Sequence, residues 1–353
     1  MVPVPPEREH RIFSGFVVED VVVDGGTVHV RHAGTGPVVL LLHGHPRTGS
    51  TWHRVAWRLL ALGCTVVVPD LPGYGASLAP DPSPDHTAHS KRASAERLLA
   101  AMRVLGYERF TVVGHDRGSY VAFRMAMDHP EAVGRVALLD SIPIVEHLER
   151  MSPEFATQWW HWFFFMQPEI PERVILADPD RWYRGDPEAM GAENHGEWRH
   201  AMRSPRVVRA MLEDYRAGLT VDRADEGADR DAGRRLSQPL LVLWSARDDL
   251  EQLFGDPLVI WRDWAVDVRG GLGLRPGLAA SEALSHPLRS AFSRRTVRSW
   301  SGVVRVGGPR GSPLWCLPQA LRSRDSPGAP VASPTCARRR PTRDQLRARR
   351  RWR

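Results

Sequence analysis

The sequence has few cysteines, a single lysine and no long hydrophobic segment. Its three cysteines, Cys64, Cys316 and Cys336, are an odd number, and none lies in a CxxC or other metal-binding spacing. They indicate free thiols in a reducing compartment rather than a disulfide framework. No apolar run approaches the roughly 18 residues that span a bilayer, and the first residues lack the pattern of a signal peptide. We therefore expect a cytoplasmic protein without a membrane partner.

Signatures of cofactors and of nucleic-acid binding are also scarce. The chain has no metal-ligand cluster, phosphate loop or dinucleotide fingerprint, so no cofactor and no metal are expected. The net charge of +7 is unevenly distributed, because residues 271–353 hold 18 arginines and three acidic residues, whereas residues 1–270 have a net charge of −8. An acidic body gives no reason to expect a nucleic-acid partner.

What the sequence does contain is an alternation of short apolar strands and helices. This alternation predicts the α/β class, with a mostly parallel, doubly wound sheet and its chemistry at the carboxyl ends of the strands. Strands are predicted at 17–23, 27–33, 38–42, 65–69, 110–113, 136–139 and 240–244, and helices at 52–62, 93–105 and 120–129.

Composition divides the chain into four segments. Residues 12–144 are expected to form the first part of the core, 145–225 an aromatic-rich helical lid, and 226–269 the continuation of the core. Residues 270–353 form a tail rich in Arg, Pro, Gly and Ser, which we predict to be disordered. Such a tail would replace the last strand and leave an unpaired sheet edge. The composition of this tail is also what translation of a GC-rich gene in the wrong reading frame would give.

The most informative pattern is GHDRG at 114–118, which follows an apolar strand and precedes a helical stretch. This is the form of a nucleophile elbow, a tight strand-to-helix turn that presents one side chain above the sheet. The residue at the apex is Asp116. A carboxylate there favours attack on an sp3 carbon and an alkyl ester intermediate. The alternative is that Asp116 is an ordinary helix N-cap.

Several motifs together resemble α/β-hydrolases with an aspartate nucleophile. They are HGHPRT (43–48), TWHRVA (51–56), DLPGYG (70–75) and GHDRG (114–118). The lid stretches WHWFF (160–164) and DYRAG (214–218) are similar to the haloacetate (fluoroacetate) dehalogenases, which are related to epoxide hydrolases. The resemblance extends from about residue 12 to residue 268.

The resemblance implies a role for each matching residue. Asp116 would displace halide from the α-carbon, and the N–H groups of His45 and Arg117 would form an oxyanion hole. The Arg117 side chain would bind the substrate carboxylate, unless it pairs with a neighbouring acid. The lid side chains of His161, Trp162 and Tyr215 would donate hydrogen bonds to the leaving halide. The alternative is that these three side chains only fill the core of the lid.

Two further catalytic positions are less well defined. The acid that orients the base is Asp140 or Asp248, each following a core strand, and the dehalogenase pattern favours Asp140. The base should be a histidine after the last strand. The only histidine in the tail is His286, which lacks the neighbours expected of the family. Loss of the base would let Asp116 be alkylated and then stall as an ester.

A second departure concerns the substrate. Dehalogenases of this kind have a second arginine shortly after the elbow, and here that position is Tyr120. The leading hypothesis is thus a haloacetate dehalogenase-like hydrolase that the missing base would impair, with room for a larger or neutral substrate. The alternatives are an epoxide hydrolase and an inactive hydrolase relic whose basic tail binds nucleic acid. The partner is then a small molecule, either a halogenated carboxylic acid or an epoxide, and the sequence leaves a homodimer open.

Overall fold

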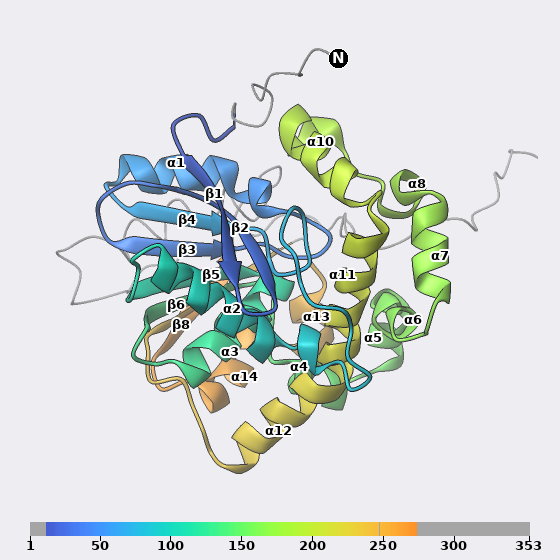
Figure 1. Ribbon diagram of the computed structural model, residues 1–353. Helices are drawn as coiled ribbons and strands as arrows, with labels where there is room; N and C mark the ends of the chain where they lie inside the picture. Colours follow the sequence, from blue (N-terminus) through green and yellow to red (C-terminus); the bar gives the residue numbers. More distant parts are fainter. Residues whose placement is uncertain (1–11, 247, 274–353) are drawn as a thin grey trace, which may run out of the picture. The chain divides into compact units, whose positions relative to one another are not determined.

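The computed structural model describes residues 12–246 and 248–273, which contain one eight-stranded sheet (Figure 1). The strands are β1 Val17–Val23, β2 Gly26–Ala33, β3 Val38–Leu42, β4 Thr65–Pro69, β5 Phe110–His115, β6 Val133–Leu139, β7 Leu240–Ser245 and β8 Val268–Gly273. Their order across the sheet is β1-β2-β4-β3-β5-β6-β7-β8. The pairs β1–β2 and β2–β4 are antiparallel and all others are parallel. The predicted mostly parallel sheet is therefore confirmed.

Helices cover both faces of the sheet and fill a long insertion between β6 and β7. They are α1 His53–Ala61, α2 Lys91–Val104, α3 Arg117–Asp128, α4 Ile144–Glu149, α5 Pro153–Gln158, α6 His161–Phe165, α7 Ile170–Ala177, α8 Pro179–Tyr183, α9 Pro187–Met190, α10 Ala192–Ala201, α11 Pro205–Ala217, α12 Arg223–Asp231, α13 Leu250–Phe254 and α14 Pro257–Trp264. Short 3-10 turns lie at Gly49–Trp52 and Thr87–His89, and a π-helical turn lies at Gly218–Asp222. In Figure 1 the helices α6, α7, α8 and α10 gather on one side of the sheet.

The central strands are apolar on both faces because both faces are covered. Leu40 and Leu42 of β3 pack with the side chains of α2 and α3, whereas Val39 and Leu41 pack with those of α1. Successive residues of a strand point to opposite faces, so a continuous apolar run serves two cores at once. The sheet therefore holds the carboxyl ends of β3, β5 and β6 side by side.

The last strand corrects one prediction. β8 runs to Gly273 and pairs with β7 along its whole length, so residues 270–273 belong to the sheet and β7 is not an edge strand. The strand has little apolar character because its glycines serve close packing. A Cβ at Gly270 would lie 1.8 Å from the carbonyl oxygen of Val242. The rest of the predicted tail, 274–353, lies outside the described residues.

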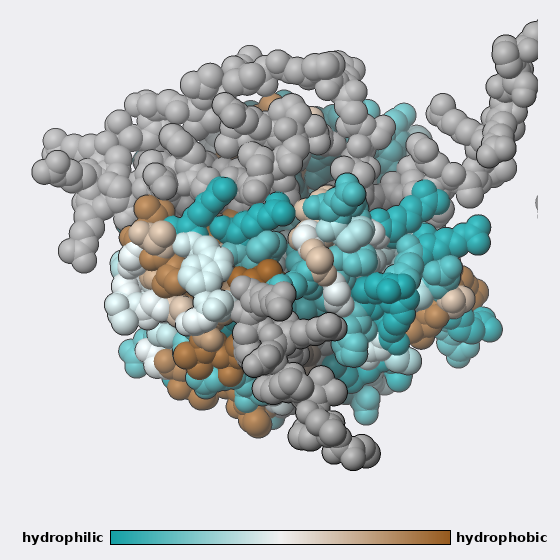
Figure 2. All heavy atoms as spheres, turned by 90° about the horizontal axis from the view of Figure 1, so that it is seen from above, coloured by the Kyte–Doolittle hydropathy of each residue, from teal (hydrophilic) through white to brown (hydrophobic). Residues whose placement is uncertain are grey.

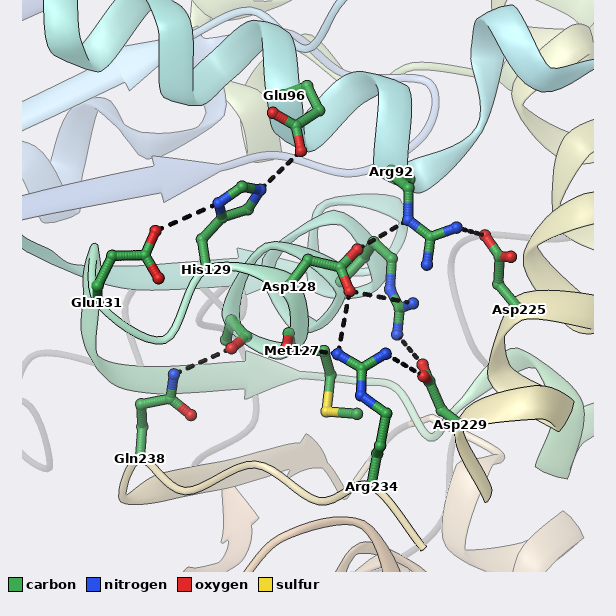
Figure 3. Close-up of polar contacts among 12 residues, drawn as sticks. Arg92, Glu96, Met127, Asp128, His129, Glu131, Asp225, Asp229, Arg234 and Gln238 are labelled. Atoms are coloured by element: carbon green, nitrogen blue, oxygen red, sulfur yellow. Dashed lines mark hydrogen bonds and ion pairs between the residues drawn. The ribbon is translucent and has the colours of Figure 1, made fainter. Parts of the chain in front are cut away.

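A polar network fastens α12 to the end of α3 (Figure 3). Arg124, which is buried on α3, pairs with Asp229 of α12, and Arg234 pairs with the same carboxylate. Arg92 of α2 bridges Asp128 of α3, at 2.9 Å from its Nε, and a carboxylate of α12. Buried arginines need such partners because an unpaired buried charge is costly. The network thus fixes the chain where it leaves the inserted helices and returns to β7.

Seen from above, the visible surface mixes hydrophilic and hydrophobic residues (Figure 2). Hydrophilic residues prevail on the side where α8 and α10 lie. No helix in the described part of the chain is long and apolar enough to cross a bilayer.

Candidate active site

The elbow follows β5 as predicted, with Asp116 at its apex. Asp116 has φ 51°, in the left-handed region, and α3 begins at the next residue. The flanking glycines leave no room for side chains. A Cβ at Gly114 would lie 2.3 Å from the Gly118 carbonyl oxygen, and a Cβ at Gly118 would lie 2.4 Å from the His43 carbonyl oxygen. The tight turn and its strained apex are typical of a functional residue rather than a surface cap.

The Asp116 carboxylate is held by backbone N–H groups. The N–H of His45 donates to Oδ1 at 2.7 Å, and the N–H of Arg117 also faces the carboxylate. Within the described chain the side chain makes no capping bond to α3. Burial raises the pKa of Asp116, and the charges of His115 and Arg117 and the two N–H groups oppose that rise. The N–H groups predicted to form the oxyanion hole thus converge on this carboxylate.

Gly44 gives a direct test of this geometry. A Cβ at residue 44 would lie 2.5 Å from both Cβ and Oδ1 of Asp116. We expect Gly44→Ala to displace the carboxylate and to slow the first turnover at least about hundredfold, since ångström-scale misplacement costs that much. The matched control is Gly227→Ala on α12, where nothing lies within 4 Å of the added Cβ. The first-turnover rate is measured by rapid sampling of the released product. Equal rates in the two variants would contradict the role of Gly44 in leaving space for the Asp116 carboxylate.

Arg117 is completely buried and is held by Asp214 of α11. Its Nε donates to Asp214 Oδ2 at 2.6 Å and its Nη2 donates to the Asp214 carbonyl oxygen at 2.7 Å. The alternative in which Arg117 pairs with a neighbouring acid is therefore present in the structure. Nη1, however, is buried and has no hydrogen-bond partner among the described residues. One guanidinium nitrogen is left to bind a ligand.

The three predicted halide donors lie next to this guanidinium. His161 and Trp162 are on α6 and Tyr215 is on α11, with ring centroids 5.9 Å (His161–Tyr215) and 6.2 Å (Trp162–Tyr215) apart. The Arg117 guanidinium carbon is 4.1 Å from the Tyr215 ring centroid and 5.8 Å from that of Trp162. Burial and Arg117 lower the pKa of His161 to about 3, so this imidazole is neutral at pH 7. The structure thus brings together residues from two distant lid segments.

The two candidate orienting acids are neighbours at the ends of β6 and β7. Asp140 has φ 52°, accepts from the Ser245 N–H at 2.7 Å and lies 3.4 Å from His115 Nε2. Burial and the charge of Asp140 raise the pKa of Asp248 well above its usual range. Asp248 therefore holds a proton more readily than an ordinary aspartate does. The candidate base, His286, lies outside the described residues.

The partner of Tyr120 was not predicted from the sequence. The Tyr120 hydroxyl lies 3.0 Å from His147 Nε2, and both side chains are buried. His147 comes from α4, at the start of the inserted helices, and burial with Arg117 lowers its pKa to about 3. The sequence places His147 in the predicted helical insertion but gives no signal that it pairs with Tyr120. In residues 12–246 and 248–273 no group of three or more His, Cys, Asp or Glu side chains could hold a metal ion.

Comparison with known proteins agrees with this fold. The family described as alpha/beta hydrolase fold matches residues 37–255. The chain belongs to the α/β-hydrolase family and is an enzyme of that class. Within the class, it is similar to the fluoroacetate dehalogenase of Burkholderia sp., with 41% identity over 268 residues that cover 73% of this chain and 86% of the relative. It is also similar to the soluble epoxide hydrolase of Corynebacterium sp. (strain C12), with 28% identity over 71% of this chain and 86% of the relative.

Solved structures give the same picture. A candidate α/β hydrolase from Nostoc sp. PCC 7120 superposes with a TM-score of 0.74 and 37% identity, over 79% of this chain and 98% of that one. A mutant of a Pseudomonas aeruginosa protein described as a candidate epoxide hydrolase, with bound MFA, gives a TM-score of 0.70 and 39% identity over 79% and 96% of the two chains. These comparisons confirm the predicted α/β-hydrolase fold.

Proposed function

We propose that this hydrolase uses Asp116 as a nucleophile to release halide from a small α-halogenated acyl compound, most like a haloacetate. The observation that carries the proposal is the Asp116 carboxylate at the apex of the elbow, 2.7 Å from the His45 N–H. The likeness to a fluoroacetate dehalogenase supports the substrate class.

The first step is a displacement at carbon. An Asp116 oxygen attacks the α-carbon, the carbon–halogen bond breaks, and the halide leaves with the bonding electrons. The polar hydrogens of His161, Trp162 and Tyr215 would stabilise charge on the halide in a buried pocket. The Nη1 group of Arg117 would orient the acyl end of the substrate.

The second step hydrolyses the alkyl ester formed on Asp116. Water adds to the Asp116 carboxyl carbon, and the negative oxygen that develops is stabilised by the N–H groups of His45 and Arg117. A base must remove a proton from that water, with Asp140 as the orienting acid. His286 is the candidate from the tail. Without a working base the reaction would stop after one halide per chain.

The test is halide release from fluoroacetate and chloroacetate by the full chain, with intact mass spectrometry of the same samples. Many halide ions per chain would mean that a base works and that the complete cycle operates. One halide per chain, with a stable mass increase, would mean that only the first step operates. No halide and no mass increase with either compound would contradict a haloacetate as the substrate, and the same result with the corresponding haloacetamides would contradict the Asp116 chemistry.

An epoxide hydrolase is the second candidate, favoured by two lid tyrosines that meet at His45. The Tyr215 ring centroid lies 5.1 Å from that of His45, and the Tyr183 hydroxyl lies 3.1 Å from His45 Nε2. Two phenols can protonate the oxygen of an opening epoxide, while Asp116 attacks its carbon. Diol formation from styrene oxide without halide release from haloacetates would favour this reading.

A further inference from the structure

The positive charge of Arg117 is compensated inside the protein. Two of its nitrogens donate to Asp214, and Lys91 Nζ donates to the same carboxylate at 2.6 Å and to Asp222 Oδ2 at 3.2 Å. Arg117 and Lys91 lower the pKa of Asp214 to about 2, so Asp214 is ionised at pH 7. The positive charges of Arg117 and Lys91 are thus matched by the negative charges of Asp214 and Asp116. The cluster of these four side chains has no net positive charge, and an ionised Asp222 would make it negative.

Neutral groups also lie beside Arg117. The Tyr120 ring centroid is 5.3 Å from the guanidinium carbon, and its hydroxyl is bonded to His147. Burial and Arg117 keep His147 uncharged at pH 7, and burial raises the pKa of Tyr120 well above its usual range. Aromatic rings enclose His147, with centroids 4.8 Å (Phe254) and 5.1 Å (Trp159) from its own. Tyr120, His147 and the rings around them therefore add no positive charge to the site.

A carboxylate is poorly matched to these surroundings. A buried anion needs compensating charge, and among the described residues around Arg117 the polar atoms without a partner are its own Nη1 and the uncharged imidazole nitrogens His45 Nδ1 and His147 Nδ1, so no further cation is available. A second negative charge beside the attacking Asp116 would also oppose the displacement. A neutral carbonyl oxygen avoids both costs and satisfies Nη1. A Tyr120 hydroxyl that donates to His147 keeps an acceptor lone pair, which an amide N–H can use.

We propose that the substrate is an α-haloamide rather than an α-halocarboxylate, with its carbonyl oxygen on Arg117 Nη1 and its amide near Tyr120. This inference rests on the proposed Asp116 chemistry. Asp116 attacks the α-carbon, halide leaves with the bonding electrons, and water hydrolyses the ester. The products are an α-hydroxyamide, halide and one proton, and Asp116 is regenerated.

The test compares first-turnover halide release from 2-fluoroacetamide and fluoroacetate, and from the matched chloro pair, with Asp116→Asn as the blank for thiol alkylation. We expect the wild type to prefer the amide at least about tenfold in kcat/KM, or in the first-turnover rate constant. Tyr120→Phe, which stays neutral but removes the acceptor for the amide N–H, should keep the amide preferred by a smaller factor. Tyr120→Arg, which adds a charge, should shift it toward the carboxylate.

The outcomes separate this inference from the function on which it rests. Preference for the carboxylate in the wild type would overturn the amide assignment and leave the Asp116 chemistry standing. Absence of Asp116-dependent halide release from all four compounds would overturn both. Because the wild-type ratio alone decides, a misfolded Tyr120→Arg chain does not affect the result.

Discussion

Replacing Asp116 with asparagine is expected to lower the first-turnover rate of halide release at least about ten-thousandfold, as loss of a nucleophile does in comparable enzymes. Asparagine has nearly the same shape, and its side-chain oxygen can still accept from the His45 N–H. It is, however, a far weaker nucleophile than a carboxylate. The measurement is rapid-quench halide release at saturating substrate, with circular dichroism to verify the fold.

The matched control is Asp180→Asn on α8. Asp180 is a partly exposed aspartate that pairs with Arg199 and Arg203 on the surface. This change should leave the rate within about twofold, because surface ion pairs contribute little. Wild-type halide release by Asp116→Asn would exclude this residue as the nucleophile and assign the elbow a structural role.

The second large effect concerns stability. Asp214→Ala is expected to reduce the free energy of unfolding by about 3–5 kcal/mol, because it leaves Arg117 and Lys91 as buried charges without this carboxylate. Urea unfolding followed by tryptophan fluorescence measures the change. Asp180→Ala, which removes a partly exposed partner of two surface arginines, should cost less than about 1 kcal/mol. Equal destabilisation by the two substitutions would show that the buried Arg117–Asp214–Lys91 cluster contributes no more to the free energy of unfolding than a surface ion pair does.

Acid should reduce the difference between the wild type and Asp214→Ala. The pKa of Asp214 is lowered from the usual 3.8 to about 2 in the folded chain. Its stabilisation is therefore complete above about pH 4 and declines as the pH falls toward 2. Unfolding free energies measured at pH 7, 4 and 3 should converge at the acid end. A difference that grows with acid would contradict the assigned sign.

Much of the fold is predictable because the central strands have a strong local pattern. The β3 and β4 segments are continuous apolar runs bounded by turn residues, and both strands have the predicted ends. The elbow is predictable for a similar reason, since the glycines of GHDRG are required by contacts of 2.3 and 2.4 Å that no side chain could accept. At these positions the local sequence pattern and the tertiary contacts favour the same structure.

Other features depend on partners that are distant in the sequence. β8 forms on the edge provided by β7, although its glycines give little strand signal. The Arg117–Asp214 pair joins residues 97 positions apart, and no pattern in either segment indicates it. Tyr120 is visible in the sequence as a departure from the family, but its meaning depends on His147, which α4 brings to it. Such pairings arise only when the inserted helices pack on the core.

The most direct test of the Asp116 chemistry is one turnover in water enriched in the heavy oxygen isotope, followed by peptide mass spectrometry. If Asp116 is the nucleophile, the peptide that contains it must carry either the alkyl ester or, after hydrolysis, one heavy oxygen atom. The first result would mean that hydrolysis stalls, and the second that a base completes the cycle. An unmodified Asp116 peptide, with all the heavy oxygen in the released product, would contradict the proposed mechanism.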